Sequence, residues 1–105
     1  MILEVNNDTF NEEVLEASNP VVVDFYASWC TPCKMLTPVL EETKEELLDQ
    51  GFDFDFVKVN IDDCPEIAEK YDIKVLPTLV LFKDGKEIEK KIRPSDKDDI
   101  IEWLG

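Results

Sequence analysis

The spacing of hydrophobic residues along this chain switches between the short period of strands and the longer period of helices. Five stretches read as strands: residues 2–5, 21–27, 52–61, 78–83 and 86–92. The second stretch is apolar on both faces, as expected for a strand at the centre of a sheet with helices on either side. Asp84-Gly85 separates the last two stretches and predicts a hairpin, so these two strands should pair antiparallel.

The longest helical pattern covers residues 33–50. It places leucines on one side and mostly glutamates on the other, which predicts a helix with one buried face. Pro38 lies within the pattern and should kink the helix, because proline removes a backbone hydrogen bond. Gly51 suits the first position after the helix end, where a left-handed backbone is common.

Three shorter helices are indicated by the residues at their starts. Thr9 and Glu12 fit a capping box at the beginning of the first helix. Ser95 and Asp98 fit a weaker one at the beginning of the last helix. A short helix is predicted between them over residues 66–71, since the proline before it suits a first helical position.

Composition and charge restrict the classes of function. The 105 residues are enough for a single domain, residues 1–105, and 44% are hydrophobic, so the chain can bury a core. With 25 acidic and 11 basic residues, the formal charge is −14. This charge argues against binding to nucleic acid or to an anionic membrane. The acidity is expected to serve solubility, and charge-steered choice of partners is the alternative.

The start of the chain carries neither a basic segment nor a long apolar one, and no stretch approaches the ~20 apolar residues of a membrane span. We therefore expect no signal peptide, unless the chain is a mature form whose leader has been removed. The expected location is the cytoplasm, where closely spaced cysteines are more often catalytic than structural.

Cys30 and Cys33 stand three residues apart where the long helical pattern begins. On a first helical turn their Cβ atoms would lie roughly 5–6 Å apart, and a small tightening would permit a disulfide without changing the fold. The free N–H groups and the positive dipole end of a helix start would stabilise a thiolate. We expect Cys30 to be the exposed nucleophile and Cys33 the more buried resolving thiol.

Two other interpretations of the pair compete with redox chemistry. A structural zinc site normally takes four Cys or His ligands, and this chain has three cysteines and no histidine, so we expect no metal. The two cysteines could also be ordinary core residues, although Trp29 and Pro32 beside them argue against this. The redox interpretation requires strands and helices around the pair.

Two charged residues interrupt apolar strands. Asp24 lies in the strand that leads to the cysteines, and a carboxylate buried there without a partner should have a raised pKa. The alternative is an edge position where Asp24 reaches water. Lys58 lies among apolar residues, where a lysine whose charged end extends to solvent explains the pattern equally well.

Two segments carry a family resemblance. Residues 21–34, VVVDFYASWCTPCK, resemble the active-site segment of the thioredoxin family, and residues 76–85, LPTLVLFKDG, resemble its second signature. The resemblance extends from about residue 5 to the C-terminus. It implies an α/β thioredoxin fold, with a central mixed sheet of about five strands and about four helices on its two faces.

The resemblance also implies roles for individual residues. Asp24 matches the buried aspartate that handles the proton of the resolving cysteine, and Lys58 matches a lysine that tunes this aspartate. Pro77 would be a cis-proline against the cysteines, and Leu76 before it would offer its backbone to a bound peptide. Trp29 would shield the disulfide and contact partners.

The chain departs from the family pattern around the cysteines. Thr31 replaces the usual glycine, which leaves the redox potential open, whereas Pro32 in place of a histidine favours a reductant. Arg93 stands where a glycine commonly lines the substrate groove, and it could obstruct some partners, attract acidic ones, or simply be solvated. The predicted substrate-binding set is Trp29, Thr31, Pro32, Leu76, Pro77 and Arg93.

Cys64 is not part of the family's active-site motif. A helix start would lower its pKa, whereas the acidic residues around it would raise it. We expect a thiol with no part in the reaction. Regulation or an intermolecular disulfide is the alternative.

By its resemblance, the chain is expected to be a thioredoxin-like protein disulfide reductase that works as a monomer without a bound cofactor. Its partners would be oxidised proteins and a thioredoxin reductase, which draws electrons from NADPH or ferredoxin. Two alternatives are a disulfide oxidase or isomerase and a non-catalytic binding subunit with the same fold.

Overall fold

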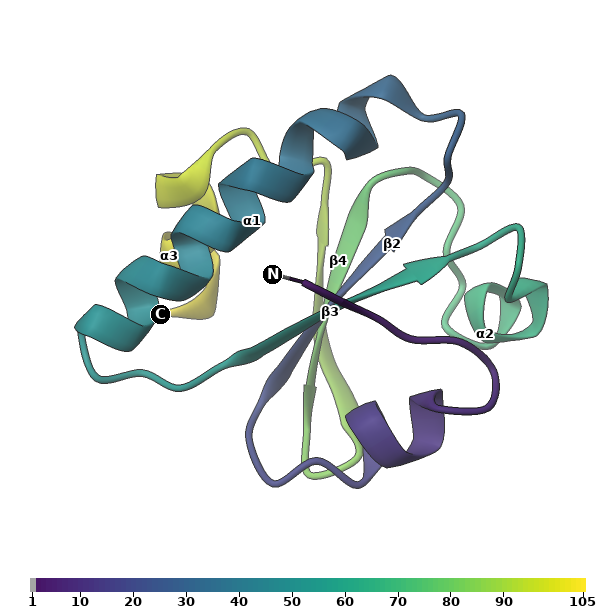
Figure 1. Cartoon of the computed structure of the whole chain (residues 1–105), viewed down its shortest axis with the longest axis horizontal. Coiled ribbons are helices and arrows are strands. Elements are labelled where there is room, and N and C mark those ends of the chain that lie inside the picture. Colours follow the sequence, from purple (N-terminus) through teal and green to yellow (C-terminus); the bar gives the residue numbers. More distant parts are fainter. Residues whose placement is uncertain (1) are drawn as a thin grey trace.

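The computed structural model describes residues 2–105 and shows a five-stranded sheet between two layers of helices (Figure 1). The strands are β1 (Leu3–Glu4), β2 (Val21–Tyr26), β3 (Asp55–Asn60), β4 (Thr78–Lys83) and β5 (Lys86–Ile92). The helices are η1 (Asn11–Leu15), α1 (Thr31–Asp49), α2 (Pro65–Lys70) and α3 (Lys97–Leu104). The predicted fold class is confirmed.

The sheet is mixed, with the strand order β1-β3-β2-β4-β5. Strand β3 runs parallel to both β1 and β2, whereas β4 runs antiparallel to β2 and to β5. The predicted hairpin joins β4 to β5, and both of its turn residues, Asp84 and Gly85, have the positive φ that such a turn requires. Strand β2 is thus central, as its two apolar faces predict.

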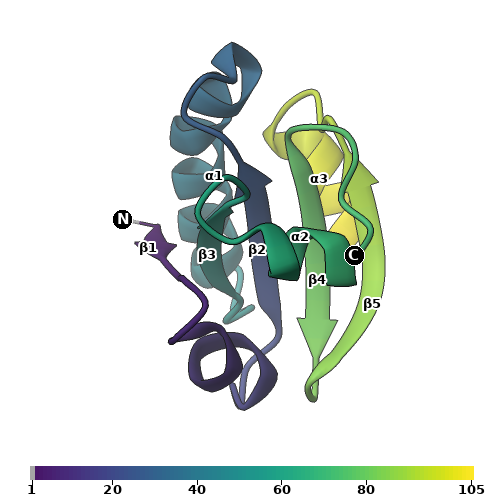
Figure 2. The ribbon, with the colours of Figure 1, turned by 90° about the vertical axis from the view of Figure 1, so that its right-hand side faces the viewer.

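Helices α1 and α3 cover one face of the sheet, and η1 and α2 cover the other (Figures 1 and 2). The side chains of β2 alternate between two cores: Val23 and Phe25 pack on the η1 side, whereas Val22 packs with Leu40 of α1. Asp24 follows the same alternation and therefore lies on the face that α1 covers. This places a carboxyl group beneath the helix that carries the cysteines.

The expected caps of the first and last helices are each wrong by one residue. Helix η1 starts after Phe10, which caps it without a side-chain hydrogen bond. In the turn before it, the Asn6 side chain accepts from the backbone amide of Thr9 (3.1 Å), and the Thr9 hydroxyl accepts from the Asn6 amide (3.0 Å). In α3 the cap is Asp96, whose side chain accepts from the Asp99 amide (2.9 Å), one residue later than the expected Ser95. Several neighbouring residues can cap, and packing selects among them.

Helix α1 begins two residues earlier than expected, continues through Pro38, and ends in a Schellman motif. Gly51 has a φ of 90°, and its amide donates to Leu48 O (3.0 Å), as its predicted position after the helix requires. The amide of Phe52 then donates to Leu47 O (2.8 Å). Because this motif uses Phe52, β3 starts at Asp55, and the expectation of a strand from residue 52 is wrong.

Candidate active site

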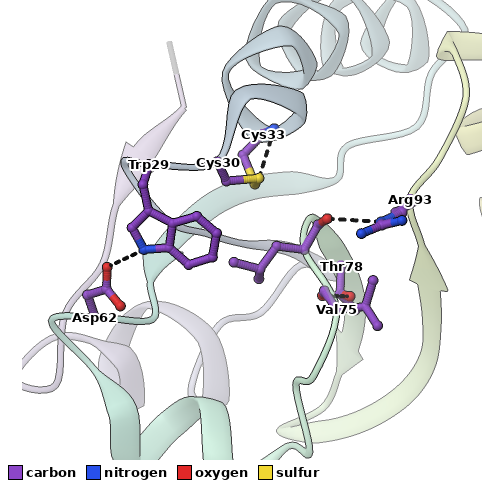
Figure 3. The surroundings of a disulfide bond; sticks show 8 residues. Trp29, Cys30, Cys33, Asp62, Val75, Thr78 and Arg93 are labelled. Carbon is purple, nitrogen blue, oxygen red and sulfur yellow. Dashed lines mark hydrogen bonds between the residues drawn. A yellow bond between two sulfur atoms is a disulfide. The ribbon is translucent and has the colours of Figure 1, made fainter.

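The cysteine pair lies where the chain leaves β2 and enters α1 (Figure 3). Cys30 is the N-cap of the helix, and its sulfur accepts from the backbone amide of Cys33 (3.3 Å). The two residues form a disulfide, with their Cα atoms 5.3 Å apart. Pro32 fits the first turn, because its missing N–H would have had no partner there.

The helix start provides an electrostatic setting for a thiolate. Cys30 lies at the positive end of a 19-residue helix, whose first turn carries no acidic residue although the chain has 25. When the disulfide is reduced, backbone N–H groups and the helix dipole therefore favour the ionised form of Cys30.

Cys30 is less exposed than expected. Its residue exposure is 6%, against 2% for Cys33, because Ala27, Leu76 and other apolar residues pack around the pair. Cys30 is the more exposed of the two cysteines, as predicted, but the difference in exposure is small. Cys30 lines a groove of about 440 Å³, which we call the first groove. Its lining is Trp29, Cys30, Thr31, Pro32, Ile61, Ile73, Lys74, Val75, Leu76 and Arg93.

Trp29 is the most prominent apolar side chain beside the disulfide. It is 69% exposed, and its indole Nε1 donates to Asp62 Oδ2 (2.9 Å; Figure 3). Sequence reasoning did not identify Asp62 as part of the site. Trp29 and Asp62 follow β2 and β3, which are parallel neighbours, so both residues emerge at the same edge of the sheet.

The segment before β4 forms the opposite side of the site. The Leu76–Pro77 peptide bond is cis, as the resemblance implies. The carbonyl oxygen of Leu76 accepts from Arg93 Nε (3.2 Å), and the carbonyl oxygen of Pro77 accepts from the backbone amide of Arg93 (2.9 Å). Thr78, the first residue of β4, donates its hydroxyl hydrogen to the carbonyl of Val75 (Figure 3). Leu76 and Arg93 thus lie together and line the same groove.

Asp24 is buried in the central strand β2, with an exposure of 2%. The alternative of an edge position in contact with water is therefore wrong. Among residues 2–105, its Oδ1 atom has no hydrogen-bond partner. Burial raises the pKa of Asp24 to about 7, and the charge of Lys58 acts in the opposite direction.

Lys58 lies on β3, directly opposite Asp24 of β2 on one side and Glu4 of β1 on the other. Its Nζ atom lies 5.5 Å from the centre of the Tyr26 ring, within range of a cation–π interaction. The Tyr26 hydroxyl donates to Glu4. Sequence reasoning missed Glu4 and Tyr26, because their proximity to Lys58 depends on strand order and register.

Cys64 lies apart from the pair, at the start of α2, with an exposure of 1%. Burial raises the pKa of its thiol, and nearby acids such as Asp63 act in the same direction. Residues 2–105 contain no cluster of three or more Cys, His, Asp or Glu that could hold a metal ion. Within the same range, no helix is long and apolar enough to cross a membrane.

A cysteine pair at a helix start, delivered by the central strand of an α/β sheet, defines a class of thiol–disulfide redox proteins. Comparisons with known proteins agree. The family model for thioredoxin matches residues 1–105. A thioredoxin of Rickettsia bellii is 43% identical over 99% of this chain and 96% of its own length, and one of Chlamydia trachomatis is 45% identical over the same shares. Thioredoxin 1 of Synechococcus elongatus is 47% identical over 81% of this chain and 77% of its own length.

The chain therefore belongs to the thioredoxin family. With its Cys30–Cys33 pair, it is a thiol–disulfide oxidoreductase. Proteins of this family carry no bound cofactor.

Proposed function

We propose that this protein reduces disulfides in other proteins. The observation that carries the proposal is the unequal placement of the two cysteines in a thioredoxin-family chain: Cys30 lines the first groove, and Cys33 lies behind it in the first turn of α1. A substrate disulfide that enters the groove meets one sulfur first. The other sulfur is then positioned to complete the exchange.

The reaction proceeds in two exchanges. The Cys30 thiolate attacks one sulfur of the substrate disulfide, a bond forms between these two sulfurs, and the second substrate sulfur leaves as a thiolate. The Cys33 thiolate then attacks the Cys30 sulfur and displaces the first substrate sulfur. Two electrons pass to the substrate, whose two thiolates take up protons, and the protein is left with the Cys30–Cys33 disulfide.

Asp24 is assigned to proton handling for Cys33. It lies beneath α1, and its pKa of about 7 allows it to accept or release a proton near neutral pH. Lys58 tunes Asp24 through its charge, since the two residues lie side by side on neighbouring strands.

The substrate is expected to lie in the groove formed by the predicted binding set. Trp29, Thr31, Pro32, Leu76 and Arg93 line the first groove, and Pro77 lines the adjoining hollow beside Arg93. Leu76 offers its backbone, and the exposed indole of Trp29 contacts the partner and shields the disulfide. The protein is expected to act as a monomer.

Recycling requires an external reductant. We infer that a thioredoxin reductase supplies two electrons from NADPH or ferredoxin to the Cys30–Cys33 disulfide. The expected location is the cytoplasm, whose reducing conditions maintain the dithiol form.

The redox potential of the Cys30–Cys33 pair tests this function. It should be measured against a dithiothreitol or glutathione series in the Cys64→Ser background, which removes the third thiol. A potential near the value typical of thioredoxins, about −270 mV, supports a reductase. A potential near −200 mV or higher would contradict it and point to disulfide donation or isomerisation, with Thr31 as the first residue to exchange for glycine.

A double variant, Cys30→Ser with Cys33→Ser, distinguishes the reductase from a non-catalytic binding subunit. The variant should reduce no protein disulfide. Full biological activity in this variant would show that the fold serves only as a partner subunit.

A further inference from the structure

Arg93 lies between two hollows on the face that carries the disulfide. It lines the first groove and also a second groove of about 290 Å³, whose lining is Pro32, Met35, Leu36, Val39, Pro77, Arg93, Pro94 and Ser95. Neither groove is lined by an aspartate or a glutamate, although the chain has 25 of them. Lys74 is the only other charged side chain in the two linings, and the carboxylates of Asp62 and Asp72 beside the first groove already have partners, in Trp29 and in Lys74.

The Arg93 guanidinium is held in place but not neutralised. Its Nε atom donates to the Leu76 carbonyl (3.2 Å), and Figure 3 shows the side chain extending from the end of β5 toward this oxygen. Lys74, by contrast, already has a carboxylate partner in Asp72 (3.5 Å), and Lys91 has one in Asp99 (2.9 Å). Within residues 2–105, no ion pair involves Arg93, and its two Nη groups are available to a ligand.

The backbone of Arg93 has a left-handed conformation that favours glycine. Its φ is 46°, and this conformation costs free energy in any residue with a side chain. The side chain forms no ion pair within the described part of the chain that would offset this cost. A strained residue with an unused charge at the rim of a reactive site points to an interaction with something that binds there.

From these observations we propose that Arg93 is a specificity-determining residue. It favours substrate proteins that carry an aspartate or a glutamate within a few residues of the disulfide that Cys30 attacks. The carboxylate pairs with the Nη groups of Arg93 while the neighbouring sulfur reaches Cys30, and Nε stays on Leu76. Arginine suits this contact because its planar group can bind a carboxylate through two parallel hydrogen bonds. The inference rests on the proposed reductase function.

The test uses disulfide-bonded synthetic peptides in matched pairs. The two peptides of a pair differ at a single position, one or two residues before or after a cysteine. This position holds glutamate in one peptide and glutamine in the other. The rate constant for oxidation of the reduced protein is measured by stopped-flow, and the glutamate rate is divided by the glutamine rate. Because the peptides' own reactivity is the same for every protein variant, differences in this ratio between variants report on the protein.

The ratio for at least one pair should be about 2- to 5-fold higher in the wild type than in Arg93→Gln, as expected for a partly exposed ion pair. Arg93→Gly, which suits the left-handed backbone, should lower it to the same extent. Lys86→Gln is the matched control, because it changes the net charge equally but lies at the other end of β5, roughly 20 Å away. Its ratio should equal that of the wild type.

Equal ratios in the wild type, Arg93→Gln and Arg93→Gly for every pair would overturn the role of Arg93. The same decrease in Lys86→Gln would also overturn it, because net charge alone would then explain the effect. If the wild type reduces neither peptide of any pair, the proposed reductase function fails, which is a distinguishable result.

Discussion

Asp24 and Lys58 lie side by side in register on the parallel strands β2 and β3, on the face of the sheet that α1 covers. One is a buried acid whose Oδ1 atom has no hydrogen-bond partner within the described residues, and the other is a half-buried cation. Burial raises the pKa of Asp24, and Lys58 limits the rise. The protonation of Asp24 therefore depends both on its burial and on the charge of Lys58.

The first prediction concerns stability. Because the pKa of Asp24 is about 7 in the folded protein against a usual value of 3.8, the folded state holds this proton more tightly than the unfolded chain does. Between about pH 4 and pH 7, folding therefore takes up a proton. As the pH rises through this window, the free energy of unfolding should fall by about 1.4 kcal/mol for each pH unit. Asp24→Asn abolishes this loss.

Denaturant unfolding of the oxidised protein between pH 4 and pH 8 measures the effect. Asp24→Asn should be more stable than the wild type at pH 8, by up to about 4 kcal/mol, and the difference should shrink toward pH 4. Asp49→Asn, an exposed change of the same kind in α1, is the control. A difference between Asp24→Asn and the wild type that does not depend on pH would contradict the assignment.

The second prediction concerns turnover. If Asp24 accepts the proton of Cys33, Asp24→Asn should slow the second exchange by about tenfold or more near pH 8, where Asp24 is ionised in the wild type. At pH 6 Asp24 is mostly protonated, so the wild type and the variant should react at similar rates there. Rapid-mixing measurements from pH 6 to 9 test this. Rates that coincide over the whole range would remove Asp24 from the mechanism.

The third prediction isolates Lys58. Its positive charge lowers the pKa of Asp24, so Lys58→Gln should raise the titration midpoint of the Asp24 carboxyl above about 7, by about one pH unit. The carboxyl carbon resonance of Asp24 in an NMR titration reports this midpoint directly. Lys86→Gln, with the same change in net charge, should leave it in place. A midpoint that stays constant or moves down in Lys58→Gln would show that Lys58 does not act on Asp24.

The fourth prediction concerns Cys64. Its thiol is buried in the core on the η1 side of the sheet, so it should react with a disulfide reagent only when the protein opens. In the oxidised native protein, thiol labelling should therefore be slow and should accelerate with denaturant. Cys64→Ser should retain the reductase rate. Rapid labelling in the native state, or loss of activity in Cys64→Ser, would instead indicate a functional thiol.

The fold could be predicted from the sequence because its main elements have distinct patterns. The apolar run through Val21 and Phe25 indicates a central strand, and Asp84-Gly85 indicates the hairpin. The ends of elements were less predictable. Phe52 looks like a strand residue, but its amide completes the end of α1, and this depends on the local backbone and not on hydrophobicity.

The site residues likewise divide into those that the sequence indicates and those that only the structure reveals. The redox pair Cys30 and Cys33 follows from residue type and spacing within one segment, whereas the residues alone left Asp24 either buried or at an edge, and only the family resemblance favoured burial. The contact of Trp29 with Asp62 does not follow from the sequence, because it joins residues 33 positions apart that meet only when two parallel strands end at the same edge. The hydrogen bond from Arg93 to Leu76 was likewise missed, since it depends on the path of the chain after β5.

The most direct test of the account is the trapping of a substrate by Cys33→Ser. Without the resolving thiol, the mixed disulfide between Cys30 and an oxidised protein such as insulin should accumulate, and peptide mapping by mass spectrometry should locate the bond at Cys30. Cys30→Ser should trap nothing at this position. A stable complex through Cys64, or no complex with Cys33→Ser, would contradict the central claim that Cys30 attacks the substrate.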